Sequence, residues 1–198
     1  MSEFRPLDLT LRDGTPVRAR PLGSGDRDYM AEAYRRLSPE ARYHRFWTVT
    51  GEMIGERMLD RLLKVDPGNH EIWSVYDPSR AFTPLGAASW WRDAVLPSDA
   101  EFSVTVLDQD QGRGVGTLLL AILWLTAFRA GIKRLAGHVM LENRKAAEWM
   151  RRTGAIGEWD GYKNTFYWDL EDLDRLPETR AASDLAAWLA VLSPTLLE

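Results

Sequence analysis

The chain has 198 residues, enough for one compact domain, and 45% of them are hydrophobic, which is typical of a folded protein. Its formal net charge is −4 and the basic residues are scattered, which argues against a nucleic-acid partner. The absence of cysteine excludes disulfides, thiolate metal sites and a thiol nucleophile. His44, His70 and His138 lie far apart without metal-ligand spacing, so we expect no metal.

The amino-terminal segment lacks the apolar centre of a signal peptide, and no apolar run reaches the ~18 residues that a membrane span needs. We therefore expect a cytoplasmic protein with no membrane partner. We also expect a single domain over residues 1–198, with its core at about 15–170 and a helical tail at about 178–198.

The first third of the chain predicts one strand followed by helices. Residues 15–22, bounded by prolines, favour a strand, and residues 24–37 place apolar side chains at helical spacing. Ser38, followed by Pro39, is a good cap for a second helix. Residues 52–66 predict a third helix that ends at an Asp-Pro-Gly turn.

From residue 69 onward the pattern changes to short strands alternating with helices. The predicted elements are strands at 69–77, 84–93 and 100–108, a helix at 115–130, a strand at 133–140, a helix at 142–155, a strand at 163–170 and a tail helix at 183–192. This order indicates an α/β or α+β fold in which one sheet carries helices.

The strand at 100–108 alternates cleanly between two faces. Phe102, Val104 and Val106 share one face, and Glu101, Ser103 and Thr105 share the other (sequence "EFSVTV"). A glycine-rich loop follows directly and leads into an apolar helix. Glycine at such a junction lets backbone N–H groups approach a ligand closely, most often a phosphate.

Three phosphate-binding patterns compete for this loop. A P-loop would need a lysine before Thr117, which is absent, and a dinucleotide fingerprint would need glycine at Thr117 itself. The third pattern, Q/R-x-x-G-x-G/A, matches at every position: Gln111-Gly112-Arg113-Gly114-Val115-Gly116.

That pattern is the acetyl-CoA pyrophosphate loop of the GNAT N-acetyltransferase superfamily, which the chain resembles over about residues 15–170. The segment "LSPEARYHRFW", residues 37–47, is similar to one in the GNAT domains of bacterial protein lysine acetyltransferases. The resemblance implies a mixed, mostly antiparallel sheet with a V-shaped splay, flanked by helices, and acetyl-CoA as co-substrate.

The backbone N–H groups of Gly112, Arg113, Gly114, Val115, Gly116 and Thr117 would converge on the pyrophosphate at a helix amino terminus. The helix dipole there contributes ~0.3–2 kcal/mol, and the Arg113 guanidinium could add a charged contact. By resemblance, Asn143 would hydrogen-bond the pantetheine arm while also capping the helix that it opens.

Acetyl transfer to an amine needs a base, because a lysine-type ammonium with a pKa of ~10.4 costs about 4–5 kcal/mol to deprotonate at pH 7. Related enzymes place a glutamate base where Glu101 stands, and Glu71 and Asp99 are the reserve candidates. The thioester carbonyl also needs a hydrogen-bond donor. The resemblance assigns that role to the backbone N–H of Val106.

Two positions depart from the family pattern. Met150 stands where many GNAT enzymes have a tyrosine that protonates the CoA thiolate, and Gly154-Ala155 replaces the usual Gly-Phe. We therefore assign no general acid at position 150. We expect Tyr43, Phe46 and Trp47 to be packing residues, although Arg42, Tyr43 and Arg45 have polar reach toward a substrate. We expect His138 to be an interior histidine.

The resemblance implies direct acetyl transfer to a primary amine in a ternary complex, with a protein lysine as the favoured acceptor. Small amines such as amino acids, polyamines or aminoglycosides stay open as acceptors. A non-catalytic acyl-CoA-binding or regulatory module is the alternative of a different class, and the missing tyrosine gives it weight.

Overall fold

The computed structural model describes residues 4–80, 83–159, 161 and 163–197. Its strands are β1 (Leu7–Thr10), β2 (Pro16–Pro21), β3 (His70–Asp77), β4 (Thr83–Arg92), β5 (Asp99–Val106), β6 (Arg134–Val139), β7 (Ile156–Trp159) and β8 (Asn164–Asp169). Its α-helices are α1 (Arg27–Arg35), α2 (Pro39–Phe46), α3 (Glu56–Leu63), α4 (Val115–Arg129), α5 (Arg144–Arg152) and α6 (Arg180–Leu196).

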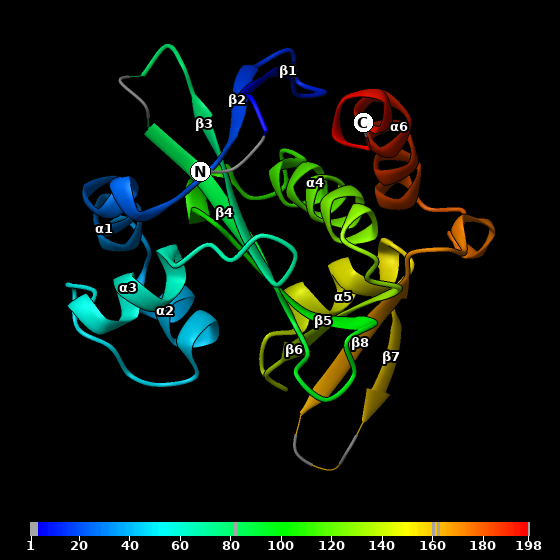
Figure 1. The fold of residues 1–198 in the computed structure, drawn as a ribbon. Helices are drawn as coiled ribbons and strands as arrows, with labels where there is room; N and C mark the ends of the chain where they lie inside the picture. The colour runs from blue at the N-terminus through cyan, green and yellow to red at the C-terminus, as the bar shows by residue number, and fades with distance from the viewer. Residues whose placement is uncertain (1–3, 81–82, 160, 162, 198) are drawn as a thin grey trace.

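The strands form one eight-stranded sheet in the order β1-β2-β3-β4-β5-β6-β8-β7 (Figure 1). Every neighbouring pair is antiparallel except β5 and β6, which run parallel. Those two strands pair only from Asp99↔Arg134 to Glu101↔Ala136, and both then continue without pairing to each other. This separation is the expected V-shaped splay, so the predicted fold class is confirmed.

Helices cover both faces of the sheet. The three helices α1, α2 and α3 lie on one face, and α4 lies on the other with α6 packed beside it (Figure 1). Nearly every side chain of α4 is buried, because the sheet occupies one side of it and α6 the other. The four buried leucines of α6 (Leu185, Leu189, Leu192 and Leu196) join that core. Each contributes about 1.5–3 kcal/mol by leaving water.

A second, smaller core lies under α1, α2 and α3. Leu59, Leu62 and Leu63 of α3 pack there with Tyr34 of α1 and Ile72 of β3. These contacts hold the three helices against β3, β4 and β5, on the face of β5 that carries Glu101. Ser38 caps α2 as predicted, since its Oγ accepts from the backbone N–H of Ala41 at 3.1 Å.

Most predicted elements are present with shifted ends, but two strands were missed. The edge strand β1 has only four residues, and all four residues of β7 are exposed, so neither carries a strong pattern. The tail helix is longer than predicted because Thr179 caps it, accepting from the backbone N–H of Ala182 at 3.1 Å.

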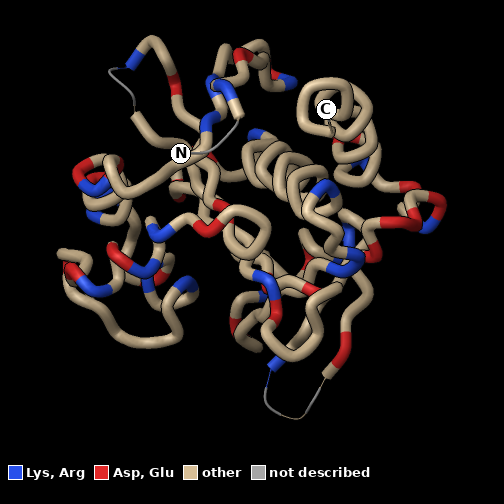
Figure 2. The backbone as a smooth tube through the Cα atoms, in the orientation of Figure 1, with Lys and Arg blue, Asp and Glu red and all other residues tan. Residues whose placement is uncertain are grey.

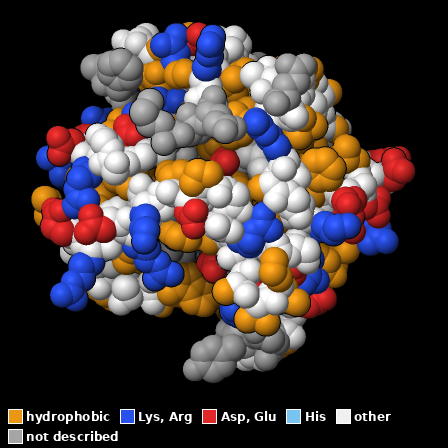
Figure 3. Space-filling model, in the orientation of Figure 1, with side chains coloured by type: hydrophobic (Ala, Val, Ile, Leu, Met, Phe, Trp, Pro, Cys, Tyr) orange, Lys and Arg blue, Asp and Glu red, His pale blue; other side chains and the backbone are white. Residues whose placement is uncertain are grey.

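Charges of both signs alternate along the chain (Figure 2), and the same mixture covers the face drawn in Figure 3. Within the described ranges, no helix combines the length and apolar character that crossing a membrane requires. The same residues contain no cluster of three or more His, Asp or Glu side chains that could hold a metal ion.

Candidate cofactor and acceptor cleft

A cleft of about 1270 Å³ opens where β5 and β6 separate. Its walls come from α2, β5, the glycine loop, β6 and the amino-terminal ends of α4, α5 and α6. Of the residues assigned a catalytic or cofactor-binding role in the sequence, those that line it are Glu101, Val106, Gln111, Gly112, Gly114, Gly116, Thr117 and Asn143. Residues 42 positions apart in the chain thus meet in one cleft.

The glycine loop has the backbone that a close anion contact needs. Gly112 and Gly114 have φ angles of 76° and 93°, in the left-handed region that favours glycine, and a Cβ added at either would meet no atom within 4 Å. The first intrahelical hydrogen bond of α4 is donated by the N–H of Leu118 to the Gly114 carbonyl at 3.0 Å. The N–H groups at the start of α4 are therefore available to an anion.

The Arg113 guanidinium binds other residues of the protein, in contrast to the expected direct contact with phosphate. Its guanidinium donates to Asp110 at 2.6 Å, to Asp13 at 3.0 Å and to the Thr15 hydroxyl at 2.7 Å. These acceptors direct it toward the turn between β1 and β2, and neither Arg113 nor Val115 is among the described residues that line the cleft. Arg113 braces the loop instead, and Val115 is buried in the core.

The end of β5 presents a backbone donor toward the splay. The N–H of Leu107 donates to Leu85 of β4 at 2.9 Å, and backbone groups alternate sides along a strand. The N–H and carbonyl of Val106 therefore point toward the edge that β6 leaves open. In agreement, the Val106 carbonyl accepts from the Gln111 side chain at 3.3 Å. The Val106 N–H therefore faces the opening of the splay, on the side from which a ligand would enter.

Glu101 lies at the apex of the splay, exposed and lining the cleft. Neither reserve base is among the described residues that line it. Glu71, on β3, accepts from the Trp73 indole at 3.3 Å, and Asp99 accepts from Arg134 at 2.9 Å. The structure thus brings Glu101, and not the reserves, to the same cleft as the glycine loop.

Asn143 lies across the cleft at the start of α5. Its side-chain oxygen accepts from the Ala146 N–H at 3.1 Å, which leaves the amide nitrogen as a donor for a ligand. Met150 is buried and packs close to Gly137, so it fills the place of the family tyrosine with an apolar side chain. The neighbouring Trp149 donates to the Thr117 hydroxyl at 3.3 Å and ties α5 to α4.

His138 and Arg45 are two further polar residues of the cleft; the sequence analysis placed His138 in the interior and gave Arg45 only as a residue with reach toward a substrate. His138 is not interior: it is half-buried on β6, lines the cleft, and contacts Thr165 through Nδ1 at 3.1 Å and Lys163 through Nε2 at 3.3 Å. Strand alternation could have revealed it, because His138 lies opposite the apolar face of Leu135 and Val139. Arg45 of α2 also lines the cleft, on the side of Glu101.

The segment at residues 37–47 is only partly a packing segment. Phe46 packs against Tyr34 with ring centroids 5.5 Å apart, as expected. Tyr43 and Trp47 instead have 36% and 42% of their surfaces exposed. Trp47 ends α2 with a φ of 58°, a rare conformation for a bulky residue, and lies at the cleft.

No family model matches the chain. Among curated proteins, it is 30% identical over 152 residues to the acetyltransferase Pat of Mycolicibacterium smegmatis, covering 76% of this chain and 44% of that protein. It is 28% identical over 160 residues to the acetyltransferase PA5475 of Pseudomonas aeruginosa, covering 76% of this chain and 81% of that one. The chain thus spans less than half of the mycobacterial relative.

Solved structures share the fold. The GNAT domain of S. lividans PAT superposes with a TM-score of 0.76 at 24% identity, covering 83% of this chain and 96% of that one. A spermidine N-acetyltransferase from Vibrio cholerae, in complex with CoA and spermine, superposes with a TM-score of 0.60 at 16% identity, covering 78% and 96%.

The splayed sheet with a glycine loop at its opening is the GNAT fold. The chain resembles GNAT acetyltransferases, in particular the GNAT domains of bacterial protein acetyltransferases.

Proposed function

We propose that the protein transfers an acetyl group from acetyl-CoA to a primary amine, by direct attack within a ternary complex. One observation carries the proposal: Glu101, the Val106 N–H and the glycine loop line a single cleft at the splay. Acetyl-CoA supplies an activated thioester when bound. The backbone N–H groups from Gly112 to Thr117 would hold its pyrophosphate, and Asn143 its pantetheine arm.

The chain's own residues would move the proton and orient the reacting groups. Glu101 accepts the proton of the acceptor ammonium, and the neutral amine then attacks the thioester carbon while the Val106 N–H donates to the carbonyl oxygen. A new C–N bond forms, the C–S bond breaks, and the CoA thiolate leaves. The nitrogen loses its second proton as the amide forms and, with Met150 in place of tyrosine, that proton reaches the thiolate through water.

A protein lysine is the first acceptor, supported by the resemblance of residues 37–47 and by the exposed aromatic side chain of Trp47 beside the cleft. A small amine is the second, and a specific observation favours it: an inner pocket that continues from the cleft on the Glu101 face of β5. A protein that only binds acyl-CoA would use the same loop without needing Glu101.

Acceptor-dependent release of CoA tests this proposal. The purified protein is given acetyl-CoA with lysine peptides, amino acids, polyamines or aminoglycosides, and the free thiol is measured. Release that depends on an amine supports transfer. Binding of acetyl-CoA without release in the presence of any of these amines would mean a binding module instead.

A further inference from the structure

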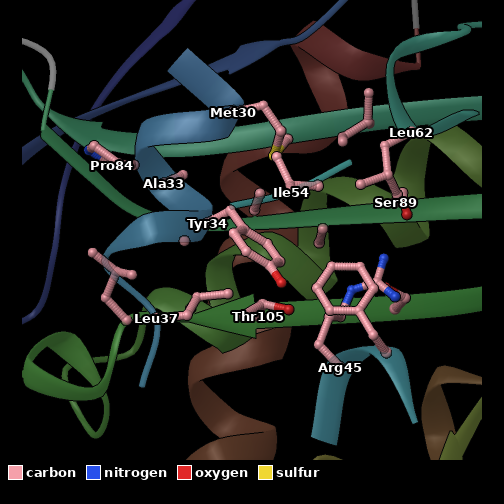
Figure 4. Close-up of a pocket in the computed structure, with 17 residues that line it drawn as sticks. Met30, Ala33, Tyr34, Leu37, Arg45, Ile54, Leu62, Pro84, Ser89 and Thr105 are labelled. Carbon is pink, nitrogen blue, oxygen red and sulfur yellow. The ribbon is translucent and has the colours of Figure 1, made fainter. Parts of the chain in front are cut away.

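An inner pocket of about 60 Å³ lies between the Glu101 face of the sheet and the helices α1, α2 and α3 (Figure 4). Its walls are mostly apolar, from Met30, Leu37, Ile54 and Leu62 among others. Arg45, Ser103 and Thr105 line both this pocket and the main cleft. The pocket is therefore an extension of the cleft, on the face of β5 that also carries Glu101.

Three hydroxyl groups of this pocket lack a hydrogen-bond partner. The Oγ atoms of Ser89 and Ser103 and the Oγ1 of Thr105 are buried, and none has a partner in the part of the chain that the structure describes. Ser89 as a whole is only 1% exposed. An unpaired buried hydroxyl costs free energy, so three of them in one small pocket indicate a polar ligand.

Arg45 adds a positive charge to the same place. Figure 4 shows Arg45 and Ser89 on the same side of the pocket. The Arg45 guanidinium stacks over the Phe46 ring at 5.2 Å, and the described residues offer it no ion-pair or hydrogen-bond partner. Burial lowers the pKa of Arg45 while the Glu101 carboxylate acts to raise it, but an arginine stays protonated in either case.

The charges of Glu101 and Arg45 complement a ligand that has one cationic end and one anionic end. Glu101 likewise makes no ion pair with another described residue, and its attraction to Arg45 acts across the cleft that both side chains line. An ammonium group beside Glu101 and an anionic group beside Arg45 would complement both. A polyamine would instead bring a second cation toward Arg45, which is unfavourable.

We infer that the inner pocket is an acceptor subsite for a small amine that also carries a carboxylate, as an amino acid does. Arg45, Ser89 and Ser103 donate hydrogen bonds to the carboxylate, and the apolar walls admit a short aliphatic side chain. The inference rests on the proposed acetyl transfer and names the substrate class of that site. A protein lysine, whose carboxyl is in a peptide bond, would not use Arg45 in this way.

Matched pairs of amines test the inference. L-alanine is compared with ethylamine, and L-leucine with 3-methylbutylamine, at equal concentrations of neutral amine, with spermidine and a lysine peptide as further acceptors. We expect kcat/KM for CoA release to be at least tenfold higher for the amino acid of each pair. Equal values within the pairs, or release with the lysine peptide alone, would overturn the subsite and leave the acetyl transfer standing.

Variants assign the effect to the pocket. Arg45→Met should lower kcat/KM for the amino acid about tenfold to a hundredfold, the value of a charge-assisted hydrogen bond, while the matched amine and the Kd for acetyl-CoA stay unchanged. Arg61→Met, which removes an exposed cation close to Arg45 but outside the pocket, is the control. An equal loss for both amines would make Arg45 structural.

Ser89→Ala covers the case in which Arg45→Met does not fold. It removes an unpaired hydroxyl, so the free energy of unfolding should hold or rise while KM for the amino acid rises severalfold. An unchanged KM for the amino acid would contradict the subsite. CoA release with none of the amines would instead remove the proposed transfer, and the subsite with it.

Discussion

Glu101 of β5 pairs with Ala136 of β6 at the last position before the two strands separate. The carboxylate is thereby fixed at the apex of the V, where the backbone is still held by the sheet on both sides. Beyond it, the edge of β5 is free to face a ligand as far as Val106. One strand therefore carries the proposed base and the proposed carbonyl donor, five residues apart.

Replacing the proposed base should separate chemistry from binding. We expect Glu101→Gln to lower acceptor-dependent CoA release at least a hundredfold, because the amide cannot take the ammonium proton. The Kd for acetyl-CoA, measured by calorimetry, should stay within about twofold, since Glu101 lies on the acceptor side of the cleft. A parallel loss of binding and release would make Glu101 a structural residue.

A side chain in the glycine loop should block the cofactor. Gly114→Glu places a carboxylate where the pyrophosphate is proposed to bind, so acetyl-CoA binding should be lost. Gly131→Glu is a matched control at the other end of α4, because Gly131 has a φ of 80° and similar open space around it. Both variants should lose about 1–2 kcal/mol of stability from backbone strain. Binding retained by Gly114→Glu would contradict the pyrophosphate site.

We expect Arg113 to contribute more to the stability of the fold than to the binding of acetyl-CoA. Arg113→Ala leaves the buried Asp110 carboxylate without its cation, so we expect the free energy of unfolding to fall by about 1–3 kcal/mol. Asp110→Ala with Arg113→Ala should recover part of that loss in urea titrations. If Arg113→Ala instead leaves stability intact and weakens only acetyl-CoA binding, the guanidinium contacts phosphate directly.

His70 should make the fold sensitive to acid. It is 1% exposed, stacks on Trp91 with ring centroids 3.4 Å apart, and burial lowers its pKa below 6.5. The unfolded chain therefore binds a proton that the folded protein excludes. The free energy of unfolding should fall as the pH drops below about 6.5, by at most about 1.4 kcal/mol per pH unit.

Urea titrations of His70→Phe between pH 7.5 and pH 5.5 check this account. The variant should show a shallower decline than the wild type below about pH 6.5, whatever its stability at pH 7.5, where histidine is mostly neutral in both states. An identical decline in the two proteins would mean that other groups cause the acid sensitivity.

The sequence predicted the centre of the fold well because that part follows simple periods. The alternation of Phe102 and Val104 marks β5, and the apolar run after Gly114 marks α4. The edge strands β1 and β7 were not predicted. Few of their side chains are buried, so their sequences show little hydrophobic alternation.

The site was predictable only in its local parts. The glycine loop and Glu101 are neighbours in sequence, so their common cleft follows from one strand and one helix. Arg45 depends on how α2 packs against β5, and the partners of Arg113 include Asp13, which is 100 residues away. Such tertiary pairings leave no periodic signal in a single sequence, so the directions of these two arginines could not be anticipated.

Calorimetric titration of the purified protein with acetyl-CoA tests the central claim most directly, with free CoA for comparison and NAD as the negative control. The claim that the splay and the glycine loop form an acyl-CoA site predicts micromolar binding of acetyl-CoA and of CoA, and none of NAD. Failure to bind acetyl-CoA would contradict it, since the loop would then be only a turn between β5 and α4.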